Sequence, residues 1–315
     1  MLQLFNYCPI PGEYEYHMDD LQDFMQANNL HGLELFVYSK NLQCKSVKPL
    51  VKGVHLRYWP YWLDFWQGDF AKLQTAFVGN DTIQEYYWGA ENNAQWIEQI
   101  KLNISVALDE QPEYLVWHVA NSDLQETFTF DFKHTDAQVV QATAELFNAV
   151  ADCIPPDICV LFENLWWPGL RLTDPQIVAD FFAAIKHPNT GIMLDLGHLL
   201  STNPHLKTEE EGYAYAQTIV RNLGANAQKI KGVHLNYSLS GEYVLNLDPK
   251  IPENFDVGRI YEHVTNIDRH LPCQHKSLAA LIQLINPTYL VHELFYNDLA
   301  DLQCKLRKQQ LALQG

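Results

Sequence analysis

The chain has 315 residues, of which 47% are apolar, and its formal net charge at pH 7 is -17. This length and apolar share allow one large barrel or two ordinary domains, and the acidic balance disfavours general affinity for nucleic acid or an anionic membrane. No apolar run could span a bilayer, the amino terminus lacks a secretory signal, and the six cysteines form no C-x-x-C pair. The sequence therefore predicts a cytoplasmic protein with reduced cysteines and no membrane partner.

Short apolar runs alternate along the chain with longer amphipathic stretches, which is typical of strands followed by helices. In chain order, the runs that predict strands are residues 2–7, 32–36, 53–57, 114–118, 158–163, 191–195, 232–235 and 289–293. The stretches that predict helices are residues 17–30, 91–108, 136–151, 208–223, 277–285 and 298–313, with one more helix opened by Asp174 and Pro175. Residues 236–275 carry three prolines and predict an irregular insertion.

Eight strands, each followed by a helix or a long loop, predict an α/β fold of the (β/α)8 TIM barrel type. The composition shows no linker and no internal repeat, so residues 1–315 are predicted to form a single domain. The alternative is an open doubly wound sheet. Such a sheet normally carries a Gly-rich phosphate loop after its first strand, whereas C-P-I-P-G-E follows here.

Histidines and carboxylates stand where most of the predicted strands end. They are His55, His118, Glu163, Asp195 with His198, His234, and Glu293. Taken alone, Asp195 and His198 are explained as well by a cap and a local hydrogen bond. Because the carboxyl ends of parallel strands open on one face of a barrel, however, the whole set should converge. Mixed oxygen and nitrogen ligands suit a divalent cation, so the sequence predicts a metal centre at the barrel mouth.

Five motifs on successive predicted strands carry a resemblance to known proteins. They are G-L-E-L-F on the second strand, F-E-N on the fifth, L-D-L-G-H on the sixth, G-V-H-L-N on the seventh and H-E-L-F on the eighth. With these motifs in this order, the chain resembles the xylose isomerase-like TIM-barrel superfamily. That superfamily includes sugar-phosphate isomerases and epimerases and the type IV apurinic endonucleases (AP endonuclease family 2), and the resemblance covers essentially the full barrel.

The isomerase and epimerase branch implies one shared metal site, formed by Glu163, Asp195, His234 and Glu293. The metal would be manganese, cobalt, zinc or magnesium, and it would chelate the carbonyl and adjacent hydroxyl of a sugar. Glu163 and Glu293 would move a proton through a metal-stabilised enediolate, and His198 would either support a metal ligand or contact a substrate oxygen. We therefore expect a metal-dependent sugar or sugar-phosphate isomerase or epimerase with a small carbohydrate substrate.

The nuclease branch implies a different enzyme, a phosphodiesterase that acts on abasic DNA and holds up to three zinc ions. The resemblance assigns its additional ligands to His55, His118, His198, Asp268 and His270. Tyr58 lies three positions after His55, where these nucleases place a residue against the DNA. The full complement of ligand types is present in the order that this branch requires.

The residues around these ligands favour the isomerase branch. The nuclease-type His-Pro-Gly on the fourth strand is here His118-Val119-Ala120, and Tyr237 stands where an aspartate is expected. The acidic net charge makes a nucleic-acid partner still less expected. A third hypothesis, a non-catalytic barrel, gives no reason for four convergent ligands. The substrate, its phosphorylation, the native metal and the oligomeric state, including a homo-oligomer, stay open.

Aromatic residues crowd the segments after the third and fifth predicted strands, as Y-W-P-Y-W-L-D-F-W and Trp166-Trp167. At a barrel mouth such rings either stack on a sugar or pack together as a lid or subunit contact. Trp59 and Trp166 are the predicted substrate contacts, and Arg57 is a candidate phosphate ligand. Glu34 ends the second predicted strand and is either a partner of a metal ligand or a structural hydrogen-bonding group.

Overall fold

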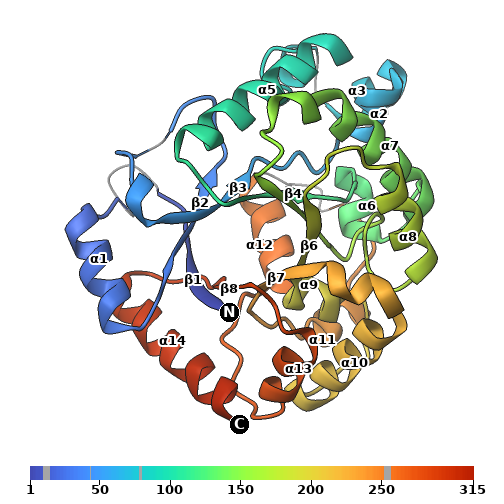
Figure 1. The fold of residues 1–315 in the computed structure, drawn as a ribbon. Helices are drawn as coiled ribbons and strands as arrows, with labels where there is room; N and C mark the ends of the chain where they lie inside the picture. Colours follow the sequence, from blue (N-terminus) through green and yellow to red (C-terminus); the bar gives the residue numbers. More distant parts are fainter. Residues whose placement is uncertain (10–14, 43, 78–79, 252–256) are drawn as a thin grey trace.

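The predicted strands form a closed parallel barrel in a computed structural model that describes residues 1–9, 15–42, 44–77, 80–251 and 257–315. The strands are β1 (Leu2–Tyr7), β2 (Gly32–Val37), β3 (Val51–Leu56), β4 (Tyr114–His118), β5 (Cys159–Glu163), β6 (Thr190–Asp195), β7 (Ile230–His234) and β8 (Tyr289–His292). They are ordered as in the sequence, and β8 pairs with β1 to close the ring (Figure 1). The predicted (β/α)8 TIM barrel is confirmed.

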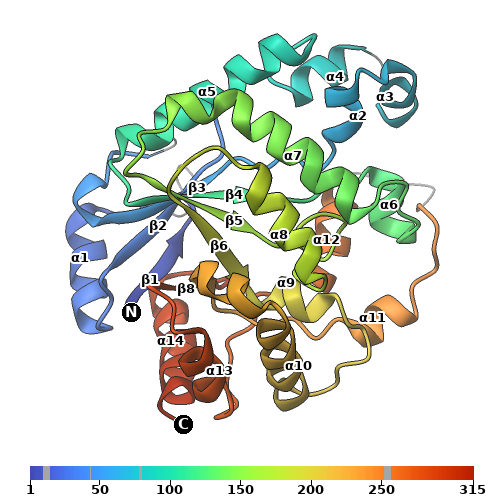
Figure 2. The same ribbon diagram turned by 45° about the vertical axis from the view of Figure 1, so that its right-hand side comes forward.

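Helices surround the barrel and also cover part of one of its ends. They are α1 (Met18–Ala27), α2 (Leu63–Gln67), α3 (Phe70–Ala76), α4 (Asn80–Tyr86), α5 (Asn93–Asp109), α6 (Leu124–Thr129), α7 (Asp136–Val150), α8 (Pro175–Ala184), α9 (Leu196–Ser201), α10 (Glu209–Asn222), α11 (Gly241–Leu245), α12 (Val257–Ile267), α13 (Leu278–Ile285) and α14 (Leu299–Gln314). Figure 2 shows α6, α11 and α12 beyond the end of the barrel where β4, β5 and β6 finish. The functional residues predicted at strand ends lie on this side.

Local sequence explains where the main helices begin. Thr208 opens α10 with a capping box, in which its side chain accepts a hydrogen bond from the backbone of Glu211 and the Glu211 side chain accepts one from the backbone of Thr208. Asp174 caps α8, and Pro175 occupies the first turn, where its missing N–H costs nothing. The predicted helix ends lie within a few residues of the observed ones. A difference of this size is expected, because capping residues fix where a helix ends and hydrophobic periodicity does not.

Four segments contain helices that the sequence did not predict. Residues 236–275, which were predicted to be irregular, hold α11 and α12, and the segment between β3 and α5 holds α2 to α4. In addition, α6 lies between β4 and α7, and α9 follows β6 directly. In α12, Ile260, Val264 and Ile267 recur at helical spacing. The prolines of the same segment concealed that pattern, and the other unpredicted helices are too short for a periodicity to stand out.

The barrel interior is filled by a small set of side chains that alternate along the strands: Leu4, Tyr114, Val116, Cys159, Leu161, Met193 and Val291. The ring of Tyr114 occupies the space over Gly53, where any Cβ would overlap it. The Tyr114 hydroxyl donates a 2.7 Å hydrogen bond to Glu34. A second, larger core lies between the strands and the surrounding helices.

The aromatic run after β3 packs as the core of the layer formed by α2 to α5. Trp96 is almost fully buried at its centre, and its ring centroid lies 5.9 Å from that of Trp59, 6.1 Å from that of Trp62 and 5.6 Å from that of Phe65. These rings bury large apolar areas against one another. The run therefore has the packing role that was one of its two interpretations.

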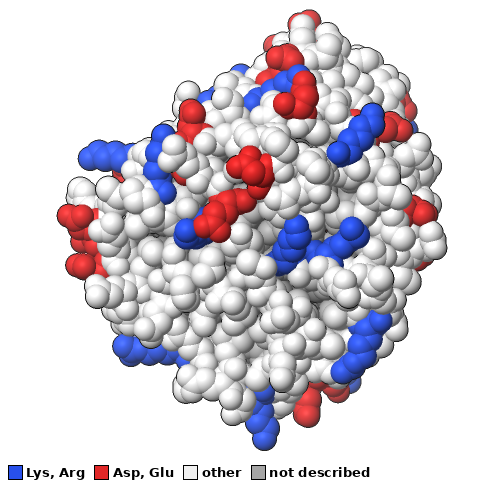
Figure 3. All heavy atoms as spheres, viewed as in Figure 1, with Lys and Arg blue, Asp and Glu red and all other residues white. Residues whose placement is uncertain are grey.

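On the face shown in Figure 3, acidic and basic side chains lie in small separate groups among uncharged residues. The negative net charge is therefore not gathered into one continuous patch on that face. None of the described helices has the length and apolar character needed to cross a membrane.

His292 should make the stability of the protein depend on pH. Its ring is fully buried between Gln309 of α14, 2.6 Å from Nδ1, and Gln3 of β1, 3.1 Å from Nε2. Burial lowers the pKa of His292 to about 4, so below its ordinary value near 6.5 the unfolded chain binds a proton that the folded chain does not. Stability is therefore full above about pH 6.5 and falls as the pH drops toward about 4.

When the pH falls from 8 to 5, His292 should lower the free energy of unfolding by about 2 kcal/mol. Urea unfolding at the two pH values checks this. The decrease in the free energy of unfolding between pH 8 and pH 5 should be about 2 kcal/mol smaller in His292→Gln than in the wild type. His205→Gln, at an exposed position, is the matched control and should keep the wild-type loss. An unchanged pH dependence in His292→Gln would contradict the prediction.

Candidate metal centre

The strand periodicity places the candidate ligands on the axis of the barrel. Glu163 lies two residues after Leu161, Asp195 two after Met193, and His118 two after Val116, and all three preceding residues fill the barrel interior. Because alternate residues of a strand share one face, each ligand continues the inward-facing row into the mouth. His55, His234 and Glu293 follow the same rule after Gly53, Gly232 and Val291.

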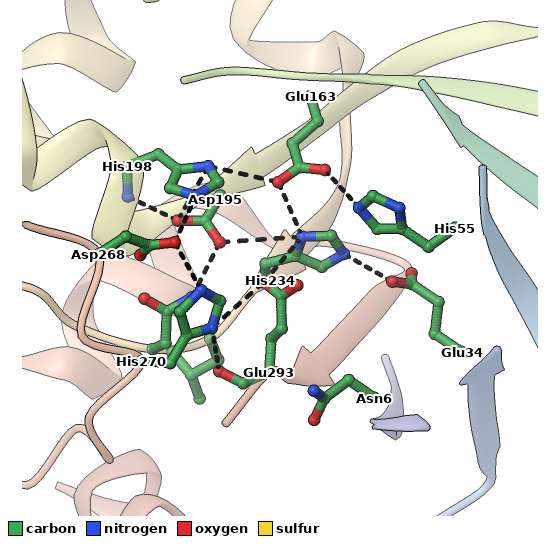
Figure 4. A network of polar contacts seen from close by, with 12 residues as sticks. Asn6, Glu34, His55, Glu163, Asp195, His198, His234, Asp268, His270 and Glu293 are labelled. Atoms are coloured by element: carbon green, nitrogen blue, oxygen red, sulfur yellow. Dashed lines mark hydrogen bonds and ion pairs between the residues drawn. The ribbon is translucent and has the colours of Figure 1, made fainter. Parts of the chain in front are cut away.

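Three groups of side chains converge there, and each has the composition of a metal site (Figure 4). In each group the ligand atoms lie within 4.8 Å of one another. The first group is His55, His118 and Glu163; the second is Glu163, Asp195, His234 and Glu293; the third is His198, Asp268 and His270. Together they contain every ligand residue predicted from the sequence.

Glu163 belongs to two of these groups and joins them through its two carboxylate oxygens. Oε2 lies 3.1 Å from Nε2 of His55 and 3.4 Å from Nε2 of His118. Oε1 lies 3.3 Å from Nδ1 of His234. Each oxygen thus faces a different group, so the one carboxylate could contribute a ligand atom to both.

Asp268 is the only carboxylate of the third group. Its Oδ2 lies 2.7 Å from Nε2 of His270 and 3.2 Å from Nε2 of His198. The two histidines come from separate parts of the chain, one from α9 and one from the segment after α12. The third group therefore depends on the segment that the sequence predicted to be irregular.

Hydrogen bonds on the outer side of the rings fix which imidazole nitrogen faces the centre. Nδ1 of His198 donates to the carbonyl of Asn164 at 2.8 Å, and Nδ1 of His270 donates to the carbonyl of Glu293 at 3.1 Å. Nδ1 of His55 likewise donates to the carbonyl of Leu56 at 3.1 Å. A carbonyl only accepts, so each of these rings presents Nε2 to its group, as histidines that bind metals commonly do.

His234 has the opposite orientation, and Glu34 is the cause. Nε2 of His234 lies 2.9 Å from Oε1 of Glu34, and both side chains are fully buried. This contact leaves Nδ1 facing Glu163 and Glu293, at 3.3 Å and 3.2 Å. Both interpretations that the sequence left open for Glu34 apply, because it contacts the candidate ligand His234 and also accepts the structural hydrogen bond of Tyr114.

Two asparagines hold Asp195 in place. Asn164 exchanges hydrogen bonds with the backbone of Asp195, at 2.9 Å and 3.0 Å, and Asn236 donates to Oδ2 at 2.8 Å. Gly197 allows Asn236 to approach, since a Cβ at that position would overlap the Asn236 side chain. Oδ1 of Asp195 also accepts the backbone N–H of His198 at 2.6 Å and so caps α9. The cap and the ligand role are therefore compatible.

Neither asparagine was among the site residues predicted from the sequence, although the motifs contained both. Asn164 is the last residue of F-E-N and Asn236 the last of G-V-H-L-N. An amide directly after a buried strand end is a signal of a group that positions its neighbours, because a buried amide must be hydrogen-bonded.

The titratable side chains in the cluster strongly shift one another's pKa values. Burial lowers the pKa of His198 and His234, but the carboxylates around them outweigh it and raise both well above the ordinary value. Burial raises the pKa of Glu293 to about 8, whereas burial lowers that of His118 to about 3. Such opposed shifts within one cavity are typical of functional sites.

The donor set fits divalent cations. Oε1 of Glu163, Nδ1 of His234 and Oε2 of Glu293 are buried and have no hydrogen-bond partner among the described residues. Buried polar atoms without partners cost free energy unless something binds them. Atoms of this kind, converging with mixed oxygen and nitrogen chemistry, are suited to zinc, manganese or a similar ion.

The residues predicted to contact the substrate have separate locations. The guanidinium of Arg57 lies 5.0 Å from the ring of Trp59 and 4.9 Å from that of Trp88, and it donates to the carbonyl of Tyr38. Trp59 donates through Nε1 to the carbonyl of Tyr86. The structure thus places Arg57 and Trp59 in the aromatic layer beside α5, whereas Tyr58, between them, stacks on His118.

Trp166 and Tyr58 do lie against the ligands. The ring of Trp166 lies 5.2 Å from that of His198, and the ring of Tyr58 is stacked at 4.5 Å on that of His118. Both rings cover an outer side of a metal-ligand candidate and help to keep water from it. Trp166 stays a predicted substrate contact.

A cavity of about 700 Å³ opens above the three groups. His55, His118, Glu163, His198, Asp268, His270 and Glu293 line its floor, and Phe36, Tyr261, Thr265, Phe295 and Tyr296 are among the residues of its walls. Tyr261 and Thr265 belong to α12, so this helix forms one side of the opening. The volume is that of a site for a small organic molecule.

Comparisons with known proteins establish the fold of this chain. No protein-family model and no curated protein matches it. Among solved structures, endonuclease IV from Thermus thermophilus is 13% identical, with a TM-score of 0.53 and coverage of 100% of this chain and 99% of that one. A D-tagatose 3-epimerase-like protein is 12% identical, with a TM-score of 0.55 and coverage of 100% and 98%.

A xylose isomerase domain protein from Planctomyces limnophilus is similar too, at 11% identity, a TM-score of 0.50 and coverage of 99% of this chain and 95% of that one. The chain therefore has the barrel fold of these proteins, as its strand pattern predicted. An endonuclease and an epimerase-like protein are both among these structures, so the fold alone does not distinguish the two reactions.

Proposed function

We propose that this protein is a metal-dependent hydrolase that cleaves phosphodiesters at a centre of three divalent cations of the zinc or manganese type. One observation carries the proposal: five residues outside the group of Glu163, Asp195, His234 and Glu293 complete two further ligand groups around it. A single-metal isomerase has no need of those two groups. The geometry thus favours the hydrolase, whereas the residues next to the candidate ligands in the sequence favoured the isomerase.

Charge supports the same chemistry. In the loaded centre the four carboxylates would carry four negative charges and three divalent cations six positive ones, so the centre would attract an anion inside an acidic protein. When bound, the cations would polarise a phosphoryl group and lower the pKa of a water molecule. Glu163 would set the spacing between two of them, and the hydrogen bonds to Glu34, Asn164 and Glu293 would keep three of the histidine rings from turning.

The second candidate is the sugar isomerase or epimerase. It is favoured by one observation, namely that Glu163, Asp195, His234 and Glu293 form a complete four-residue group without help from the others. In that reaction Glu163 and Glu293 would transfer the proton on either side of one cation. His198, Asp268 and His270 would then contact substrate oxygens instead of a metal.

Elemental analysis together with two assays separates these functions. We expect about three divalent cations per chain, matching the three ligand groups, in protein purified without chelator. We also expect hydrolysis of bis(p-nitrophenyl) phosphate that a chelator abolishes and added zinc or manganese restores. One cation per chain, no hydrolysis and exchange of a ketose C–H proton with solvent would establish the isomerase instead.

A further inference from the structure

The walls of the cavity above the metal centre differ in character from its floor. The floor consists of the charged ligand groups, whereas the walls carry four aromatic side chains: Phe36, Tyr261, Phe295 and Tyr296. Phe36 is stacked on the ring of His55 at 4.3 Å, and Phe295 lies 4.4 Å from the ring of His270. Aromatic surface thus begins directly beside the ligands.

Two of these rings are exposed to an extent that is unusual for large apolar side chains. Tyr261 is 64% exposed and Phe295 is 42% exposed. They approach the opening from different elements, Tyr261 from α12 and Phe295 from the segment after β8. Exposed rings at the rim of a polar cavity are available to a ligand rather than to the core.

Cations are scarce in the same walls. Among the described residues that line the cavity, Lys305 is the only lysine or arginine. Its ammonium group is already held by Asp301 at 2.8 Å and by the carbonyl of Phe295 at 2.7 Å. A site for duplex DNA needs several basic side chains along the phosphate backbone, because neutralising phosphates supplies most of the affinity.

We propose that the substrate of this centre is a small phosphate ester that carries an aromatic group, of the size of a nucleotide, and not a nucleic-acid duplex. The proposal rests on the hydrolase function above and names its substrate class. The phosphate would lie over the three ligand groups, and the aromatic group would stack on Tyr261 or Phe295. The cavity volume of about 700 Å³ agrees with a ligand of this size.

Binding of simple probes to the metal-loaded protein tests this proposal without depending on turnover. By calorimetry, phenyl phosphate should bind about tenfold more tightly than methyl phosphate, as expected for one aromatic stacking contact. In the double variant Tyr261→Leu, Phe295→Leu this preference should shrink, while the affinity for methyl phosphate and the metal content stay unchanged. Phe70→Leu removes a ring of 48% exposure on α3 and is the matched control.

Equal binding of the two probes by the wild-type protein would overturn the proposal, even if phosphodiesters are hydrolysed. So would cleavage of a duplex containing an abasic-site analogue at a higher kcat/KM than bis(p-nitrophenyl) phosphate, with a steep dependence on salt. If the preference for phenyl phosphate is present and lost in the double variant but no diester is hydrolysed, the aromatic site is supported and the hydrolase function fails.

Discussion

Replacing Glu163 with glutamine should remove two cations and nearly all activity. The carboxylate is the only residue common to two ligand groups, with one oxygen facing His55 and His118 and the other facing His234. The amide has no negative charge, and its nitrogen is not a ligand. We expect the metal content to fall from about three to about one per chain, and kcat/KM for bis(p-nitrophenyl) phosphate to fall by about 10³-fold or more.

The same substitution at Glu98 is the matched control for Glu163→Gln. The Glu98 side chain is 69% exposed on α5 and belongs to none of the three ligand groups. Glu98→Gln should retain the full metal content and activity. Circular dichroism and thermal unfolding of both variants would show whether the fold is intact. A Glu163→Gln variant that folds and still holds three cations would contradict the bridging role.

The positions of the ligands were predictable because strand position determines direction. A residue at the carboxyl end of a parallel strand that is two positions beyond an interior residue must face the mouth. Glu163, Asp195 and His234 obey this rule, and short apolar runs make it visible without a structure. The closed barrel follows from the same eight runs.

The preference between the two proposed functions depends on geometry between distant segments, which the sequence does not encode. Asp268 and His270 follow α12, in a stretch whose prolines suggested irregular structure. In the sequence, Val119, Ala120 and Tyr237 counted against the nuclease hypothesis. In the structure the backbone of Tyr237 pairs with Leu271, next to His270, and Ala120 pairs with Gly169. Neither departure removes a ligand from its group.

Arg57 and Trp59 illustrate a different difficulty. Both follow β3 and therefore start near the mouth, but the chain then turns toward α5, where Trp96 provides a large apolar partner. Neither alternation nor spacing encodes the direction of such a loop. Aromatic composition alone could not distinguish rings that pack with Trp96 from rings such as Tyr261 that line the cavity.

The third ligand group gives the sharpest test of the number of cations, through Asp268→Asn. Asp268 supplies the only carboxylate of this group and lies 2.7 Å from His270 and 3.2 Å from His198. Without that charge, the two histidines alone should not retain a cation. We expect the metal content to fall from about three to about two per chain, and phosphodiester hydrolysis to fall by about 10²-fold, because one cation contributes several kcal/mol of transition-state stabilisation.

Asp248→Asn is the control, since Asp248 lies in the same segment between β7 and β8 and its side chain is 74% exposed. It should change neither the metal content nor the rate. In a single-metal isomerase, Asp268→Asn would leave the one cation in place, because Glu163, Asp195, His234 and Glu293 would be untouched, and would alter only the KM for the sugar. Metal content thus discriminates between the two reactions even before a natural substrate is identified.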